Sequence, residues 1–178
     1  PYAHDMVSEK LQIYSSYHAK NLCYQYAGMK FCEEVDAGIH WHILHPYEPV
    51  QAGPYTVTPF PAKHMTEMPL MQPFIYLIED GKKSVLYLHD TGRALDDVLD
   101  YLQKENKKVD LVSFDCTYQL NPSGGDGDGH MGVDDNIRLR EKLLHLGICH
   151  QGTQYVINHF SHNSGVLHKE LCEAVNPQ

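Results

Sequence analysis

Residues 73–90 read PFIYLIEDGKKSVLYLHD, and this stretch decides the fold. It holds two runs rich in aromatic and branched apolar residues, joined through Asp80-Gly81, a dipeptide typical of hairpin turns. We therefore expect two antiparallel strands here. The second strand ends at the polar tripeptide Asp90-Thr91-Gly92, so a carboxylate stands at the end of a strand.

Downstream of the hairpin, helical and strand patterns alternate. The stretch 109–117, VDLVSFDCT, is typical of a buried strand, and a polar, glycine-rich loop, NPSGGDGDGHMG, covers 121–132. Helices are predicted over 94–108, 133–147 and 167–175, and a last strand over 153–158. This alternation predicts a layered α/β arrangement with mixed sheets.

Upstream of the hairpin, we expect strands at 11–16, 38–46 and 55–60. A helix capped by Ser15 or Ser16 should follow the first of them and run to about Cys32. With 178 residues, 42% of them hydrophobic, and no internal repeat, the chain is expected to form one domain spanning residues 1–178.

The composition of the chain argues against some classes of function and partner. The formal net charge is -9, from 14 Lys and Arg against 23 Asp and Glu, which opposes unspecific binding to nucleic acid and to anionic membranes. There is no apolar run of membrane-spanning length and no signal-peptide pattern, so we expect a cytoplasmic protein. Five cysteines without a C-x-x-C pair indicate reduced thiols rather than a disulfide framework. The 13 histidines are the unusual feature, because histidine is the commonest metal ligand.

Four polar clusters lie just beyond the carboxyl ends of predicted strands, where α/β sheets place their ligands. They are AKHM with His64, LHDTG with Asp90, GDGHMG with His130, and NHFSHN with His159 and His162. A carboxylate can bridge two cations while neutral imidazoles fill other positions, a combination that suits Zn, Mn or Fe. The sequence therefore suggests a metal centre of a hydrolytic kind.

The segments VTPFPAKH, VLYLHDTG, DLVSFDCT, DGHMG and VINHFSHN, in this order, resemble the second half of a metallo-β-lactamase-fold hydrolase. The resemblance covers about residues 11–175 and is nearest to the phosphodiesterase-like branch, which includes phosphoribosyl cyclic phosphodiesterases and tRNA 3′-end processing nucleases. It implies an α/β fold of the αββα-sandwich type, with mixed β-sheets flanked by helices.

The resemblance also implies roles. His64 would bind one divalent metal ion, His159 a second, and Asp90 would bridge both ions, which would be Zn, Mn or Fe. His130 matches the family's non-ligand histidine, which protonates the leaving group or steadies the phosphate, so we expect it to be the general acid. In addition, Asp115 would support the site, and His162 and Asn163 would either support it or face the substrate.

One family signature is missing from its expected place. The motif H-x-H-x-D-H belongs before residue 11, and the family's final strand belongs after residue 178, so we expect an incomplete fold. The stretch HWHILH at 40–45 has Leu44 where the motif has aspartate, and its histidines alternate along a predicted strand. We interpret it as a strand with a polar face rather than as the metal motif.

Two classes of function follow. In the first, a metal-bound hydroxide hydrolyses a small phosphodiester while His130 protonates the leaving group, with a lactone or another ester as the alternative substrate. In the second, the chain is a metal-free binding module. Nucleic acid is a less favoured partner, and a homodimer formed through exposed sheet edges is a further alternative. Because each metal would see only two protein ligands, we expect this chain alone to be empty or partly loaded, with little activity.

Asp90 and His159 also have structural interpretations that need no metal. Asp90 could cap the following helix, and His159 could be a loop histidine held by a backbone carbonyl. His89 precedes Asp90, so strand alternation should turn it away from the site.

Overall fold

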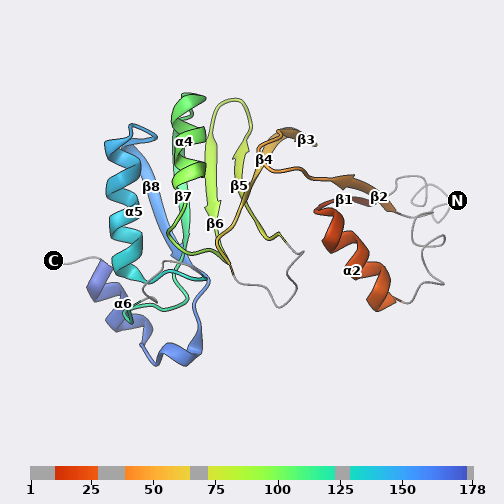
Figure 1. Cartoon of the computed structure of the whole chain (residues 1–178). Helices are drawn as coiled ribbons and strands as arrows, with labels where there is room; N and C mark the ends of the chain where they lie inside the picture. Colours follow the sequence, from red (N-terminus) through yellow and green to blue (C-terminus); the bar gives the residue numbers. More distant parts are fainter. Residues whose placement is uncertain (1–10, 28–38, 65–71, 123–128, 176–178) are drawn as a thin grey trace, which may run out of the picture.

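The computed structural model describes residues 11–27, 39–64, 72–122 and 129–175. Within these ranges the chain forms a six-stranded sheet with the order β3-β4-β5-β6-β7-β8 and a separate two-stranded sheet, β1-β2 (Figure 1). Helices flank the larger sheet, as the α/β prediction requires.

The predicted hairpin is present as β5 (Phe74–Glu79) and β6 (Ser84–Leu88), which pair antiparallel. Its turn is held by the Asp80 carboxylate, which accepts hydrogen bonds from the backbone N–H groups of Lys82 at 2.8 Å and Lys83 at 2.7 Å. These bonds keep the pKa of Asp80 below its ordinary value. Gly81 supplies the positive φ of 84° that the turn needs.

The remaining strands of the sheet are of two kinds. On one side of the hairpin, β4 (Tyr55–Pro61) pairs antiparallel with β5, and β3 (Val50–Ala52) pairs antiparallel with β4. On the other side, β7 (Val109–Asp115) and β8 (Cys149–Asn158) run parallel to β6. The sheet is therefore mixed, and the carboxyl ends of β6, β7 and β8 meet at one edge.

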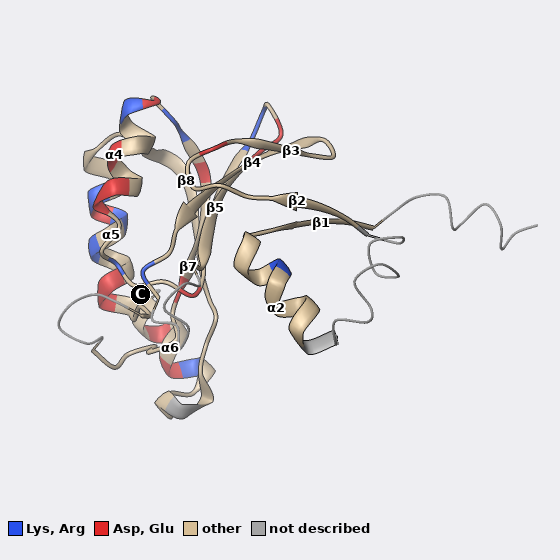
Figure 2. Cartoon of the chain, turned by 45° about the vertical axis from the view of Figure 1, so that its right-hand side comes forward, with Lys and Arg blue, Asp and Glu red and all other residues tan. Residues whose placement is uncertain are grey.

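Two helices cover one face of this sheet: α4 (Asp96–Lys104) and α5 (Val133–His145), while α6 (His168–Val175) lies near the amino end of α5 (Figure 1). Charged residues of both signs are distributed along α4 and α5 (Figure 2), and one of them, Asp135, is buried and pairs with Arg93. Fully buried apolar side chains from strands and helices form the core between them, among them Phe60, Leu77, Leu86, Leu102, Phe114 and Leu143. Burial of these side chains is the main favourable term that holds the layers together.

The opposite face of the sheet is more open. Tyr87 of β6 is 38% exposed and Val156 of β8 is 44% exposed. In the described ranges, no helix is long and apolar enough to cross a membrane.

The amino-terminal unit consists of β1 (Leu11–Ser15), α2 (Tyr17–Ala27) and β2 (Ile39–Ile43), with β1 and β2 parallel. Ser16 caps α2 as predicted, because its Oγ accepts the N–H of Ala19 at 3.2 Å. The predicted continuation of this helix to Cys32 lies outside the described residues. Apart from Lys20 in α2, these three elements carry no Lys, Arg, Asp or Glu (Figure 2).

Candidate metal centre

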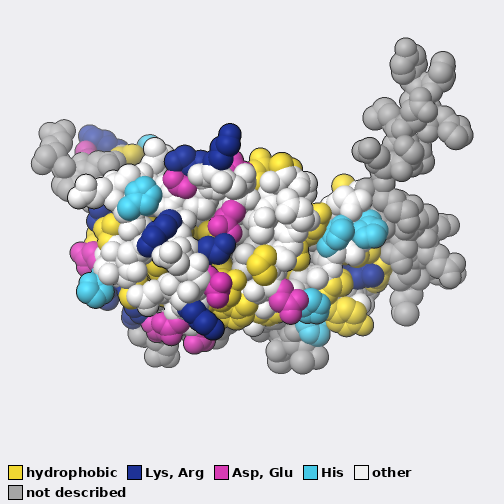
Figure 3. All heavy atoms as spheres, turned by 90° about the horizontal axis from the view of Figure 1, so that it is seen from above, with side chains coloured by type: hydrophobic (Ala, Val, Ile, Leu, Met, Phe, Trp, Pro, Cys, Tyr) yellow, Lys and Arg dark blue, Asp and Glu magenta, His cyan; other side chains and the backbone are white. Residues whose placement is uncertain are grey.

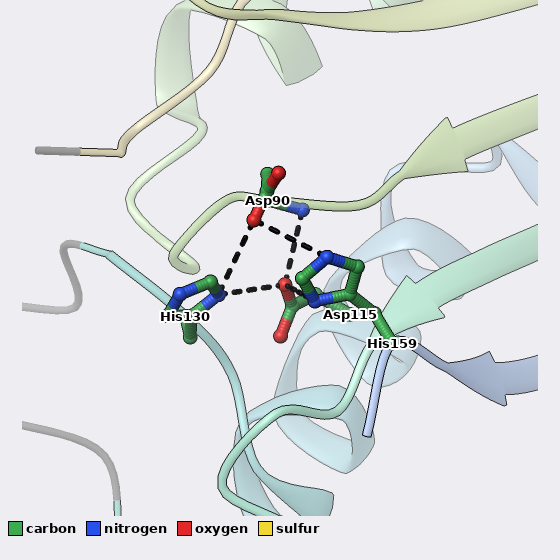
Figure 4. A group of neighbouring side chains, drawn as sticks. All are labelled: Asp90, Asp115, His130 and His159. Atoms are coloured by element: carbon green, nitrogen blue, oxygen red, sulfur yellow. Dashed lines mark hydrogen bonds and ion pairs between the residues drawn. The ribbon is translucent and has the colours of Figure 1, made fainter. Parts of the chain in front are cut away.

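The candidate site lies at the carboxyl edge of β6, β7 and β8. Asp90 comes two residues after the end of β6, Asp115 is the last residue of β7, and His159 directly follows β8 (Figure 4). His130 lies in the loop that leads into α5, and His64 lies in the segment after β4. Five side chains from five segments thus lie at one edge of the sheet, because β4 runs in the same direction as β6, β7 and β8.

The distances show that these side chains converge. Asp90 Oδ1 lies 3.7 Å from His64 Nε2 and 3.3 Å from His159 Nε2. The Nε2 atoms of His64 and His130 are 3.3 Å apart. The sequence-based expectation that His64, Asp90 and His159 share one point is therefore met by the geometry, while their roles as ligands stay predictions.

Backbone hydrogen bonds to one residue, Lys63, tie three of the site segments together. Its carbonyl oxygen accepts the N–H of Gly92 at 2.9 Å and the N–H of Gly129 at 2.7 Å. Its own N–H donates to Thr91 Oγ1 at 2.9 Å. Consequently, the segments that carry His64, Asp90 and His130 have fixed positions relative to one another.

Two of the site residues have unusual backbone conformations. Asp90 has φ 55° and His159 has φ 61°, in the left-handed region that few residues other than glycine adopt. Hydrogen bonds hold both, since the N–H of Asp90 donates to Asp115 Oδ2 at 3.0 Å and the N–H of His159 donates to Asn158 Oδ1 at 2.8 Å. Such conformations concentrate at functional sites.

Asp115 is the buried support of the site, with 0% exposure. Its Oδ1 accepts the backbone N–H groups of Thr117 at 2.9 Å and Met131 at 3.2 Å. Its Oδ2 accepts the N–H of Asp90, and His130 Nδ1 lies 2.9 Å from it (Figure 4). Because both oxygens are already occupied, Asp115 suits the supporting position that the sequence predicted for it rather than that of a ligand.

Thr117 is a site residue that sequence reasoning missed. Its Oγ1 lies 3.1 Å from His130 Nδ1 and 2.9 Å from His159 Nδ1, and it donates to the carbonyl oxygen of His159 at 2.9 Å. The available signal was a threonine just after a strand-ending aspartate, a pattern shared by Asp115-Cys116-Thr117 and Asp90-Thr91.

The structure says little about the roles of His162 and Asn163. They lie in a short 3₁₀ helix, His162–Ser164, and His162 is exposed. None of the contacts among the described site residues involves His162, and the side chain of Asn163 lies outside the described part. Their predicted supporting or substrate-facing role stays a prediction.

The interpretation of His89 needs correction. Its ring does lie on the sheet face opposite the core, where Nε2 is 2.8 Å from Ser113 Oγ and the ring centroid is 3.9 Å from that of Tyr87. However, its ring centroid is only 5.8 Å from that of His159, which directly follows β8 and has a left-handed backbone conformation. Burial, and then the proximity of His159, lower the pKa of His89. His89 therefore borders the site.

Cys116, next to Asp115, takes no part as a nucleophile. Burial, and then the charge of Asp115, raise its pKa to about 11, so the thiol stays protonated near neutral pH. Within the described ranges Cys116 and Cys149 are buried, and Cys23 and Cys172 are more accessible; all four are free.

The donor set fits divalent transition metals. Ligands bound at about 2.0–2.1 Å to one tetrahedral ion are separated by about 3.3–3.4 Å. Among the predicted ligands, Asp90 Oδ1 lies 3.3 Å from His159 Nε2 and 3.7 Å from His64 Nε2. Asp90, Asp115, His130 and His159 also each offer a potential ligand atom within 4.8 Å of the others.

The cap interpretation of Asp90 is wrong, because the N-cap position of α4 is Leu95. Asp90 lies five residues earlier, where its carboxylate faces the histidines instead of a helix terminus.

Comparisons with known proteins agree with this architecture. A family model described as the beta-lactamase superfamily domain matches residues 2–145. No curated protein matches. The metallo-beta-lactamase fold protein YhfI from Bacillus subtilis has a TM-score of 0.60 at 21% identity, over 92% of this chain and 58% of its own.

Two further solved structures are similar. A diphosphatase from the PhnP family has a TM-score of 0.60 at 17% identity, over 86% of this chain and 48% of its own. Unliganded yeast PDE1 has a TM-score of 0.58 at 16% identity, over 89% of this chain and 52% of its own. The chain thus spans about half the length of these proteins, and the likeness confirms the predicted fold class.

Proposed function

The chain belongs to the beta-lactamase superfamily, and on that premise we propose that it is the site-bearing part of a metal-dependent phosphodiester hydrolase. The observation that carries the proposal is the convergence of His64, Asp90 and His159, with His130 beside them, on one strand edge. A metal-free module has no physical need to gather imidazoles around a carboxylate that is open to solvent.

His64 would hold one cation, His159 a second, and Asp90 both. When bound, such cations lower the pKa of water and offset the negative charge of phosphoryl oxygens. The protein's own contribution is to hold the ligand atoms in place: Asp115 and Thr117 contact the Nδ1 side of His159, which leaves its Nε2 facing Asp90.

His130 is proposed as the general acid. Its Nδ1 lies against Asp115, so Nε2 is the atom from which a proton can pass to the leaving oxygen. Asp115 Oδ2, at 2.9 Å, and Asp90 Oδ1, at 3.9 Å, both lie on the Nδ1 side of this ring.

A small phosphodiester is the proposed substrate class. Among the similar structures are a diphosphatase and yeast PDE1, which favours phosphoryl chemistry over the lactone or ester alternative. The net charge of -9 favours a small substrate over a polyanion. At the end of the sheet remote from the site, lysines are interspersed with acidic residues and pair with them, as Lys83 does with Asp110 and Lys107 with Glu79 (Figure 3).

The test compares two proteins, the 178-residue chain and the product of its natural reading frame, each supplied with Zn²⁺ or Mn²⁺. Hydrolysis of a chromogenic phosphodiester, of a phosphomonoester and of a lactone is measured for both. We expect the phosphodiester to react fastest, and the 178-residue chain alone to be slow, because it brings three predicted ligands. Anomalous scattering should place cations between His64, Asp90 and His159.

The variant His130→Gln should lower kcat by about 10²–10⁴-fold while metal loading is retained. Absence of metal from both proteins, or faster turnover of the lactone, would overturn the proposal.

A further inference from the structure

One hydroxyl group touches both histidines that flank Asp115. Thr117 Oγ1 lies 2.9 Å from His159 Nδ1, 3.1 Å from His130 Nδ1 and 2.9 Å from the carbonyl oxygen of His159. Thr117 itself is held by its backbone N–H, which donates to Asp115 Oδ1 at 2.9 Å. The position of the hydroxyl is therefore fixed by the same carboxylate that supports His130.

The donors and acceptors around this hydroxyl determine where its proton lies. A threonine hydroxyl has one proton to donate and two lone pairs to accept with. The carbonyl oxygen of His159 cannot donate, so a separation of 2.9 Å between two oxygens is favourable only if the Thr117 proton lies between them. That single proton is then used, and every other partner of Oγ1 has to be a donor.

It follows that His159 Nδ1 carries a proton, which it donates to Thr117 Oγ1. His130 Nδ1 carries a proton for the same reason, and Asp115 Oδ2 is a second acceptor for both rings, at 2.9 Å from His130 Nδ1 and at the longer distance of 3.3 Å from His159 Nδ1. The Nε2 atom of each neutral ring is then left with its lone pair, facing Asp90 from His159 and facing His64 from His130.

We infer that Thr117 is a positioning residue that fixes His159, and with Asp115 also His130, in the Nδ1–H tautomer, so that the Nε2 lone pair of the proposed ligand His159 points into the metal centre. A ligating histidine needs this arrangement, in which the remote ring nitrogen donates to a fixed acceptor. The inference rests on the proposed metal centre for its purpose, but its test needs neither metal nor substrate.

The test is ¹⁵N NMR of the imidazole nitrogens in the metal-free chain at about pH 8.5, about two units above the ordinary histidine pKa. The spectra of His130→Gln and His159→Gln assign the signals. In the wild-type chain we expect protonated Nδ1 and bare Nε2 at both residues. In Thr117→Val this preference should weaken at His159, whose remaining acceptor, Asp115 Oδ2, lies 3.3 Å from Nδ1, whereas His130 should keep it through Asp115 Oδ2 at 2.9 Å.

Thr117→Ser should restore the wild-type pattern at His159, since it returns the hydroxyl. Thr153→Val is the matched control, because it removes a buried hydroxyl that donates to Val109 at the other end of the sheet. Affinity for Zn²⁺, measured by competition with a chelating dye, should fall by about 10–100-fold in Thr117→Val and stay unchanged in Thr153→Val.

A wild-type His159 that carries its proton on Nε2 would overturn the inference, as would an unchanged His159 tautomer in Thr117→Val. If Thr117→Val does not fold, Thr117→Ala takes its place, and the wild-type spectrum by itself shows which nitrogen of His159 carries the proton. Failure of the hydrolysis assay, with the tautomers as expected, would count against the proposed reaction alone.

Discussion

Two groups of histidines in this chain invite comparison: the edge cluster, formed by His64, His130 and His159, and the strand pair, formed by His40 and His42 of β2. In both groups imidazole rings lie close together. The centroids of His40 and His42 are 4.6 Å apart, and those of His64 and His130 are 4.8 Å apart. Proximity of rings alone therefore does not distinguish them.

The two groups differ in the residues that surround their rings. In the edge cluster, Asp115 and Thr117 contact the Nδ1 atoms of His130 and His159, and Asp90 faces the Nε2 atoms of His64 and His159. In the strand pair, His42 stacks on Tyr14 with a centroid distance of 4.3 Å, and its Nε2 lies 2.7 Å from Gln12 Oε1.

Of the described carboxylates, none lies within ion-pair distance of His40 or His42. A histidine suited to bind metal has one ring nitrogen held by a fixed protein group and the other free to face the ion and its carboxylate ligand. The edge cluster offers this arrangement, and the single strand β2 does not.

The largest effect should come from removing the buried support. Asp115→Ala leaves the backbone N–H groups of Asp90, Thr117 and Met131 without their acceptor, and each buried unsatisfied donor costs about 1–3 kcal/mol. We expect a loss of roughly 3 kcal/mol or more in the free energy of unfolding, measured by urea denaturation. The matched change at the strand pair, Gln12→Ala, removes an exposed partner and should cost less than about 0.5 kcal/mol. Equal losses would erase the distinction between the two clusters.

The next effect concerns metal affinity. Asp90→Asn removes the charge that faces the Nε2 atoms of His64 and His159, and we expect Zn²⁺ affinity to fall by at least about 100-fold, the upper end of what loss of an outer partner costs. Isothermal titration calorimetry measures this. Replacing both His40 and His42 by alanine should leave the affinity within about threefold of wild type. Asp100→Asn, an exposed change of equal charge on α4, is the control. A stronger effect of the β2 double variant would mean that the strand pair is the metal site.

The smallest effect is a pH dependence at the border of the edge cluster. Burial lowers the folded-state pKa of His89, so below about pH 6.5 the unfolded metal-free chain takes up a proton that the folded chain does not. Stability should therefore be fully present above about pH 6.5 and should be lost as the pH falls through the folded-state pKa. In His89→Gln, whose amide can keep the bond to Ser113, the free energy of unfolding should depend less steeply on pH. Equal slopes for the two proteins would contradict this.

Much of the fold could be predicted from local pattern. The hairpin, its Asp80-Gly81 turn, the buried strand β7 and the Ser16 cap all follow from contacts between near neighbours in the chain, which the sequence records directly. The prediction was less successful for His89, because alternation along a strand says nothing about a residue from another strand that turns back over the edge.

The candidate site divides in the same way. The sequence by itself placed His64, Asp90 and His159 close to strand ends, since strand ends are local features, whereas the prediction of a strand end before His130 was wrong, because His130 lies in the loop that leads into α5. Only the tertiary structure decided that Thr117 touches two rings, that Lys63 ties three segments together, and that His40 and His42 stand apart. The physical reason is that hydrogen bonds between segments depend on the parallel register of β6, β7 and β8, and this register is set by packing across the whole sheet rather than by any one stretch of chain.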